Sequence, residues 1–139
     1  MKKRIFGIVI VLCLVLMLVP TTAFAETSGN YTYTVDNGEA KITEFNDQTA
    51  TEVTIPFTID DYPVTAIGEN AFNYCTSLES VTIPDSVISI GEKAFNYCTS
   101  LESVTIPNSV ISIGEEAFNN CTSLKSVTIG RGVNTIGVY

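Results

Sequence analysis

An α/β solenoid built from coils of 23 residues is the fold that this sequence predicts. The clearest copy of the repeating unit runs from Ile90 to Ser112. Ile67 to Ser89 matches it at all but two positions, and Ile113 to Thr135 matches it at all but eight. Within each copy, a β-prone run alternates with a short apolar pattern of helical spacing. A fixed period of about 20 to 50 residues is typical of proteins whose units stack in one direction.

Each copy contains a predicted strand with an alternating pattern. In Ser80 to Ile83 the two apolar side chains point to one side and the two hydroxyl side chains to the other. Pro84 lacks an N–H group and ends the strand. Val87 and Ile90 return the chain in a second short extended piece, and Gly91 forms the corner. We therefore expect equivalent strands to stack as a parallel sheet on one face of the solenoid.

The α component of the prediction comes from the segment between two strands. Residues 92–98 carry apolar side chains at i, i+1 and i+4, namely Ala94, Phe95 and Cys98. This spacing predicts one short helical turn that faces inward, opposite the sheet.

The cysteine pattern follows the repeat. Cys75, Cys98 and Cys121 occupy the same position of three copies. Three cysteines in an exported chain are compatible with one disulfide and a leftover thiol. Since cysteine is among the residue types most often buried, we expect three reduced thiols stacked in the core.

The part of the chain that precedes the regular copies, residues 26–66, is expected to form an N-terminal cap. Tyr31 to Val35 and Glu39 to Phe45 are β-prone runs on either side of Asn37-Gly38. Asn-Gly between such runs is a strong hairpin indication, because a type I′ turn needs positive φ at both central residues. The hairpin is placed to cover the open end of a solenoid.

A degenerate first coil is predicted between the hairpin and the regular copies. Thr51 to Pro56 resembles the later strands, but Val53 lies 28 residues before Val81 instead of 23. Atypical terminal repeats are expected in such arrays. Residues 67–139 then hold three 23-residue copies and a truncated fourth that begins at Ile136.

Residues 1–25 have the three parts of a secretory signal peptide. Met1 to Arg4 is basic, Ile5 to Val19 is apolar, and the segment ends in Ala23-Phe24-Ala25. The alternative is a membrane anchor, which normally needs about 20 apolar residues without a small-residue cleavage site. We expect cleavage after Ala25, a secreted or cell-surface location, and no association with the membrane afterwards.

The charge after cleavage argues against nucleic acid as a partner. Removing Lys2, Lys3 and Arg4 from the seven basic residues leaves four against 15 acidic ones, a net charge of −11. An acidic surface repels phosphate backbones.

Catalytic residue patterns are weak in this sequence. There is no histidine, and the paired carboxylates Asp60-Asp61 and Glu115-Glu116 are sequence neighbours, which are normally solvated. General acid and base chemistry needs groups held together in a cleft. We therefore expect a protein that is not an enzyme and that uses no cofactor or metal ion.

The solvent-facing strand positions form the candidate binding face. Repeat proteins of this shape use extended sheet faces to bind other molecules, here an unknown protein or glycan. One alternative is a structural scaffold without a ligand, because Ser and Thr are ordinary strand residues. Another is an ordered-water template of the ice-binding type, although four rungs span only about 14 Å. The candidate residues are Thr54, Glu79, Ser80, Thr82, Glu102, Ser103, Thr105, Lys125, Ser126 and Thr128.

The C-terminal coil is a candidate for self-association. After Ile136 the sequence contains only Gly137-Val138-Tyr139, too few residues for a turn that would cover the apolar side chains of the last strand. An uncovered strand edge invites pairing with another chain.

The repeat pattern I-G-x-x-A-F-x-x-C-x-S-L-x-S-V-x-I-P-x-S-V resembles the BspA-like, or Treponema-type, leucine-rich repeats of bacterial surface proteins. The resemblance covers Ile67 to Gly137 closely, and Thr51 to Ala66 resembles the usual lead-in, although Asp61 stands where Gly is commoner. It implies a leucine-rich-repeat-like solenoid and a secreted or surface-displayed protein. Some members are described as adhesins that bind host matrix proteins or other bacteria. Members usually carry many more repeats, with surface anchors or extra domains.

Overall fold

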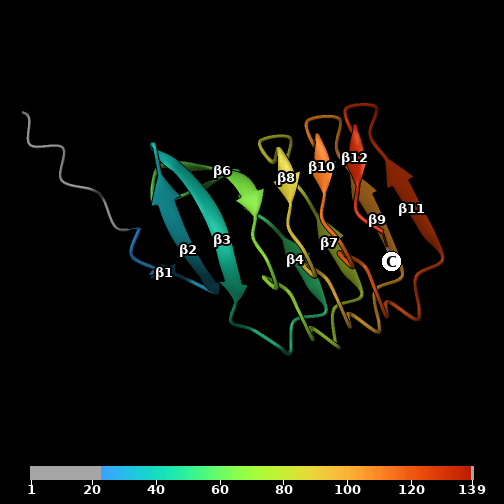
Figure 1. Cartoon of the computed structure of the whole chain (residues 1–139). Coiled ribbons are helices and arrows are strands. Elements are labelled where there is room, and N and C mark those ends of the chain that lie inside the picture. The colour runs from blue at the N-terminus through green and yellow to red at the C-terminus, as the bar shows by residue number, and fades with distance from the viewer. Residues whose placement is uncertain (1–22, 139) are drawn as a thin grey trace, which may run out of the picture.

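The computed structural model describes residues 23–138, which form a β-solenoid of about four coils. Each regular coil contributes one strand to each of two parallel stacks, which Figure 1 shows side by side along the solenoid. The four-stranded sheet has the order β11-β9-β7-β4. Its strands are β4 (Glu52–Thr54), β7 (Ser80–Thr82), β9 (Ser103–Ile106) and β11 (Ser126–Ile129).

The second parallel stack is formed by the pieces that return the chain. Equivalent residues pair in register, so that Ile67, Ile90, Ile113 and Ile136 lie in one row. The prediction of a parallel sheet on one face was therefore incomplete, because two faces carry parallel strands. The strands are β6 (Tyr62–Ile67), β8 (Ser89–Ile90), β10 (Ser112–Ile113) and β12 (Thr135–Ile136).

The α part of the α/β prediction is wrong. Residues 23–138 contain no helix, and residues 92–98 form a series of tight turns instead. Beyond its first turn, an α-helix bonds each amide to the carbonyl four residues back in the same segment, whereas here only alternate amides bond within their own turn. Lys93, Phe95 and Tyr97 donate to carbonyls of the next coil, while Ala94, Asn96 and Cys98 donate three residues back within their own turn.

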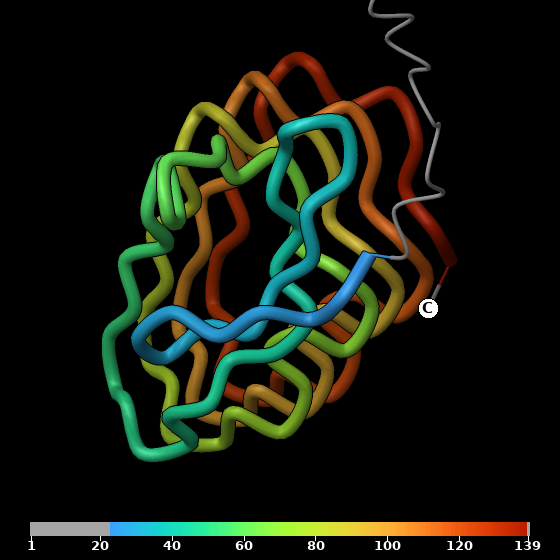
Figure 2. Tube along the Cα trace, turned by 90° about the vertical axis from the view of Figure 1, so that its left-hand side faces the viewer, coloured from blue at the N-terminus to red at the C-terminus, as the bar shows by residue number. Residues whose placement is uncertain are grey.

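The N-terminal strands form a hairpin and one further strand. β2 (Tyr31–Asp36) pairs antiparallel with β3 (Glu39–Phe45), and Asn37 and Gly38 have φ values of 52° and 81°, as a type I′ turn requires. β1 (Glu26–Ser28) pairs with the outer side of β2. Figure 2 shows these strands crossing the end of the solenoid.

The hairpin also supplies the first rung of the second stack. β3 pairs parallel with β6, which places Ile42 beside Ile67. The two-residue strand β5 (Thr58–Ile59) pairs antiparallel with β6 and lies in the same irregular first coil. The N-terminal cap is therefore continuous with the coils that it covers.

The core is a set of ladders that run along the solenoid axis. Phe45, Phe72, Phe95 and Phe118 stack with ring centroids 5.0, 4.9 and 5.2 Å apart. The first three are buried, and Phe118 in the last turn is half-buried. Coils can approach this closely only where the corner has no side chain. A Cβ added at Gly91 would lie 2.7 Å from the amide nitrogen of Glu69.

Candidate functional site: the threonine face

We use the name threonine face for the exposed side of β4, β7, β9 and β11. Thr54, Thr82, Thr105 and Thr128 occupy one row across these strands, and all four are exposed. The alternate residues Val53, Val81 and Val104 point inward and are buried. Successive residues of a strand point to opposite sides, so burial of the valines places the threonine hydroxyl groups on the exposed side.

A second row of polar residues lies beside the threonines. Ser80, Ser103 and Ser126 pair in register and are exposed, as the sequence predicts. In the first strand this row continues with Glu52, which pairs with Ser80. The sequence-based prediction did not include Glu52, because it followed the row of serines and the first strand has a glutamate at that position.

The residues that precede the strands form the entrance row. Glu79, Glu102 and Lys125 are exposed, and each amide donates to the carbonyl of the preceding coil. Lys125 Nζ lies 3.1 Å from Glu102 Oε1, with both side chains more than half exposed. Such an exposed ion pair contributes little to stability. The three residues therefore determine the charge of this edge more than they hold the fold together.

The residues that follow the strands form the exit row, which the sequence-based prediction missed. Asp85, Asn108 and Arg131 are exposed and line a shallow groove together with Thr82, Thr105 and Thr128. Asn108 Oδ1 accepts a hydrogen bond from the backbone amide of Arg131 over 2.9 Å, which ties neighbouring members of the row together. The row was detectable, because its positions are 23 residues apart and carry a different residue in every copy.

The chemistry of the threonine face is that of recognition by hydrogen bonds and charge. Its hydroxyl groups both donate and accept, and its charged groups stand at the two edges. Within residues 23–138, no group of three or more Cys, Asp or Glu side chains is arranged to hold a metal ion. The candidate residues come together as a flat polar surface, with the shallow groove along one edge.

The three cysteines of the described residues are free thiols in one ladder. Cys98 Sγ donates to the carbonyl of Phe72 over 3.2 Å, and Cys121 Sγ to that of Phe95 over 3.1 Å. Burial raises the pKa of Cys75 to about 11. The neighbouring Cys121 thiol, together with burial, raises the pKa of Cys98, and the interaction between the two thiols lowers the pKa of the half-buried Cys121.

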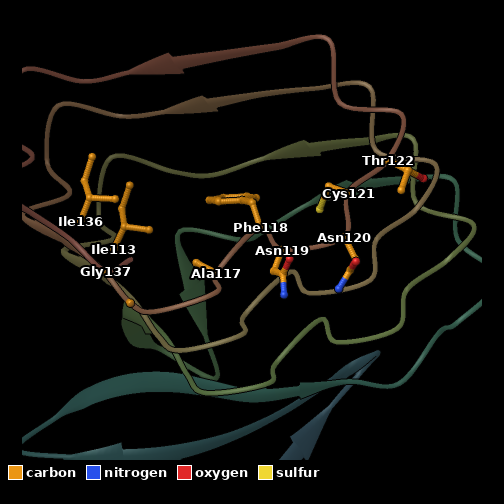
Figure 3. A pocket seen from close by; sticks show the side chains of 10 residues that line it. Ile113, Ala117, Phe118, Asn119, Asn120, Cys121, Thr122, Ile136 and Gly137 are labelled. Carbon is orange, nitrogen blue, oxygen red and sulfur yellow. The ribbon is translucent and has the colours of Figure 1, made fainter. Parts of the chain in front are cut away.

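The C-terminal end of the described chain is open. Figure 3 shows Ile113, Phe118 and Ile136 beside a pocket that the last turn leaves uncovered. Val127, Ile129 and Ile136 are 42, 48 and 56 % exposed, whereas the equivalent Val104, Ile106 and Ile113 are at most 6 % exposed. The difference arises because, within residues 23–138, no further coil packs against the last one.

Comparison with known proteins identifies the family of the chain. The profile described as BspA type leucine rich repeat region, with six copies, matches residues 39–139. The chain belongs to the BspA-type leucine-rich repeat family. The match begins in β3, the hairpin strand that supplies the first rung of the second stack. No curated protein matches the sequence.

Solved structures of bacterial leucine-rich repeat proteins have the same fold. A Bacteroides ovatus protein is 33 % identical with a TM-score of 0.72, over 82 % of this chain and 32 % of that one. A Bacteroides capillosus protein is 29 % identical with a TM-score of 0.57, over 76 % of this chain and 97 % of that one. A T. pallidum protein shows the fold at 24 % identity and a TM-score of 0.64, over 82 % and 64 %.

Two consequences concern length and location. This chain spans about two thirds of the T. pallidum protein and about a third of the Bacteroides ovatus protein. A Faecalibacterium prausnitzii protein of known structure is described as a leucine rich cell surface protein. The predicted signal peptide lies mostly in residues 1–22, outside the described residues. Residues 23–138 contain no helical segment that could span a membrane.

Proposed function

We propose that this BspA-type protein is a non-catalytic recognition module, displayed at or released from the cell surface, that binds a protein or glycan through the threonine face. The single observation that carries this proposal is the row of Thr54, Thr82, Thr105 and Thr128. The row is exposed and in register across four parallel strands. A regular, rigid row of side chains loses little conformational freedom when it binds, which favours association.

The test changes the face and leaves the core intact. Thr82→Lys and Thr105→Lys together place two long charged side chains in the middle of the row, where the native residues are exposed. We expect at least tenfold weaker binding to a panel of immobilised matrix proteins, glycans and copies of this chain. The melting temperature should stay unchanged, since surface substitutions usually alter stability by less than about 0.5 kcal/mol.

A matched control uses the same substitution at the same spacing on another surface. Thr76 and Thr99 are also 23 residues apart, but they lie in the turns between strands. Thr76→Lys with Thr99→Lys should leave binding to the panel unchanged. Equal losses from both double variants would mean that added positive charge, and not the threonine face, is responsible. Unchanged binding in the Thr82 and Thr105 variant would leave this face as a scaffold surface.

A further inference from the structure

We propose that a partner of the threonine face is the same face of a second copy of this chain, related by a twofold axis that runs parallel to the strands and passes over Thr105. This inference rests on the proposed function, because it uses the same surface. The observation that carries it is the distribution of charge along the two edges of the face.

The entrance and exit rows both change sign along the solenoid. The exit row proceeds from Asp85 through Asn108 to Arg131, and the entrance row from Glu79 through Glu102 to Lys125. All six side chains are exposed. The basic residue stands in the last coil in both rows. Lys125 and Arg131 are two of only four basic residues in residues 26–139, which carry 15 acidic ones. The face therefore has a negative and a positive end.

A twofold axis parallel to the strands matches these ends. The rotation reverses the order of the coils but keeps each row on its own side. Arg131 then lies opposite the partner's Asp85, and Lys125 lies opposite the partner's Glu79. Because the interface is isologous, each contact forms twice. The middle coil meets itself on the axis, where Asn108 is neutral and Glu102 already has Lys125 at 3.1 Å.

The alternative symmetric arrangement brings like charges together. A twofold axis along the solenoid would place each coil against the same coil of the partner and exchange the two rows. Asp85 would then face the partner's Glu79, and Arg131 would face the partner's Lys125. Like charges across an interface are unfavourable, so the charge pattern selects the first arrangement. Between the rows, small Ser and Thr side chains permit close approach of the two sheets.

The contact is expected to be weak in solution. Adjacent strands are about 4.8 Å apart, so the three coils that carry the charges extend over only about 10 Å. A contact that extends over so short a distance buries less surface than the roughly 800 Å² per partner of a standard stable interface. Many copies displayed on one surface would bind another surface much more tightly than single copies bind each other. The binding would then be homophilic, because it joins two surfaces that display the same protein.

Exchange of charges tests the proposal directly. Sedimentation velocity of residues 26–139, up to a concentration on the order of 1 mM, should show a dimer that salt weakens. Arg131→Asp and Asp85→Arg each create two repulsive contacts and should weaken the dimer at least tenfold. An equimolar mixture of these two variants should form a heterodimer at least as stable as the native dimer, because both exit-row contacts between the first and last coils then join opposite charges. Circular dichroism should show unchanged folding of both variants.

Association through the open C-terminal end is the competing arrangement. Ile136→Lys changes that end without touching the face. Loss of the dimer in this variant, with both charge variants still dimeric, would overturn the proposal in favour of association through the end. A native chain that stays monomeric at that concentration would overturn it as well. In that case, weaker panel binding by the Thr82→Lys and Thr105→Lys variant would still support recognition of a different partner.

Discussion

Left-handed backbone conformations recur at two positions of each turn segment. Asn70, Lys93 and Glu116 have φ values between 52° and 58° at the first position. Tyr74, Tyr97 and Asn120 have φ values between 57° and 62° at the second. Asn adopts this conformation more readily than other residues with a side chain, for which it costs roughly 1 to 2 kcal/mol. At each of the two positions, however, only one of the three copies has Asn.

Glu116→Asn should therefore stabilise the protein by about 0.5 kcal/mol. The substitution keeps a local hydrogen bond, since Asn73 Nδ2 donates to Asn70 in the equivalent turn as Asn119 Nδ2 donates to Glu116. It loses only the ion pair with Lys93 at 3.9 Å, and such a long pair between side chains that are about one third exposed contributes little. Urea unfolding measures the change.

The reverse substitution is the control for this prediction. Asn70→Glu should lower the free energy of unfolding by a similar amount, because it places Glu at the same left-handed position. A lower stability of Glu116→Asn would show that the ion pair with Lys93 outweighs the backbone strain.

At the scale of elements, the strands of one stack are equivalent in geometry but not in environment. β9 has a neighbour on each side, β7 and β11, and its apolar residues are buried. β11 has a neighbour only on one side, and all four of its residues are exposed. Local stability should therefore decrease toward the C-terminal coil, because fewer apolar contacts hold the last strand.

Hydrogen exchange tests this gradient. In dilute monomer, the amides of residues 127–136 should exchange faster than those of residues 104–113, because the last coil is packed on one side only. Self-association through this end, which competes with the dimer through the threonine face, would cover its unpaired edge. Protection of residues 127–136 should then increase with protein concentration. Equal protection of both segments in a proven monomer would contradict the gradient.

At the scale of the whole molecule, core ladders connect every coil to the next. The phenylalanine stack and the thiol ladder both run along the solenoid axis, so a substitution in one coil alters the packing of the coils on either side. Stability in such arrays is a sum of terms within coils and between adjacent coils. The thiols make part of that sum depend on pH.

The free energy of unfolding should fall as the pH rises above 9. Burial raises the pKa of Cys75 from 9.0 to about 11, so its contribution is complete below pH 9 and is lost as the pH rises through 11. One such thiol changes the slope by up to about 1.4 kcal/mol per pH unit. The hydrogen bond with Asp60 raises the pKa of Tyr33, which acts in the same direction above pH 10.

Urea midpoints between pH 8 and pH 10.5 measure this slope. Cys75→Val keeps an apolar side chain of similar size and removes the titrating thiol, so its midpoint should fall less steeply than that of the native chain. Parallel curves for the two proteins would show that the Cys75 thiolate is no less stable in the folded core than in the unfolded chain.

Several features follow from the sequence alone, because they depend on short-range rules. The 23-residue period places Val81, Val104 and Val127 in adjacent parallel strands, as the alternation of apolar residues predicts. Asn37-Gly38 has the positive φ values of the predicted hairpin turn. Exact repetition aligns equivalent residues, so the rows of the candidate face were predictable once the strands were identified.

Other features were decided by contacts between coils, which no single segment contains. The apolar spacing of residues 92–98 suits a helix, but alternate amides bond to the neighbouring coil. Those amides are then not available for hydrogen bonds within a helix. β3 completes the second stack at a spacing that departs from the period, since Ile42 must meet Ile67 to be buried. The groove formed by the exit row exists only where the coils stack. The alternation of apolar residues predicts which side of a strand is buried. The carbonyl partners of the backbone amides are determined only when the coils stack.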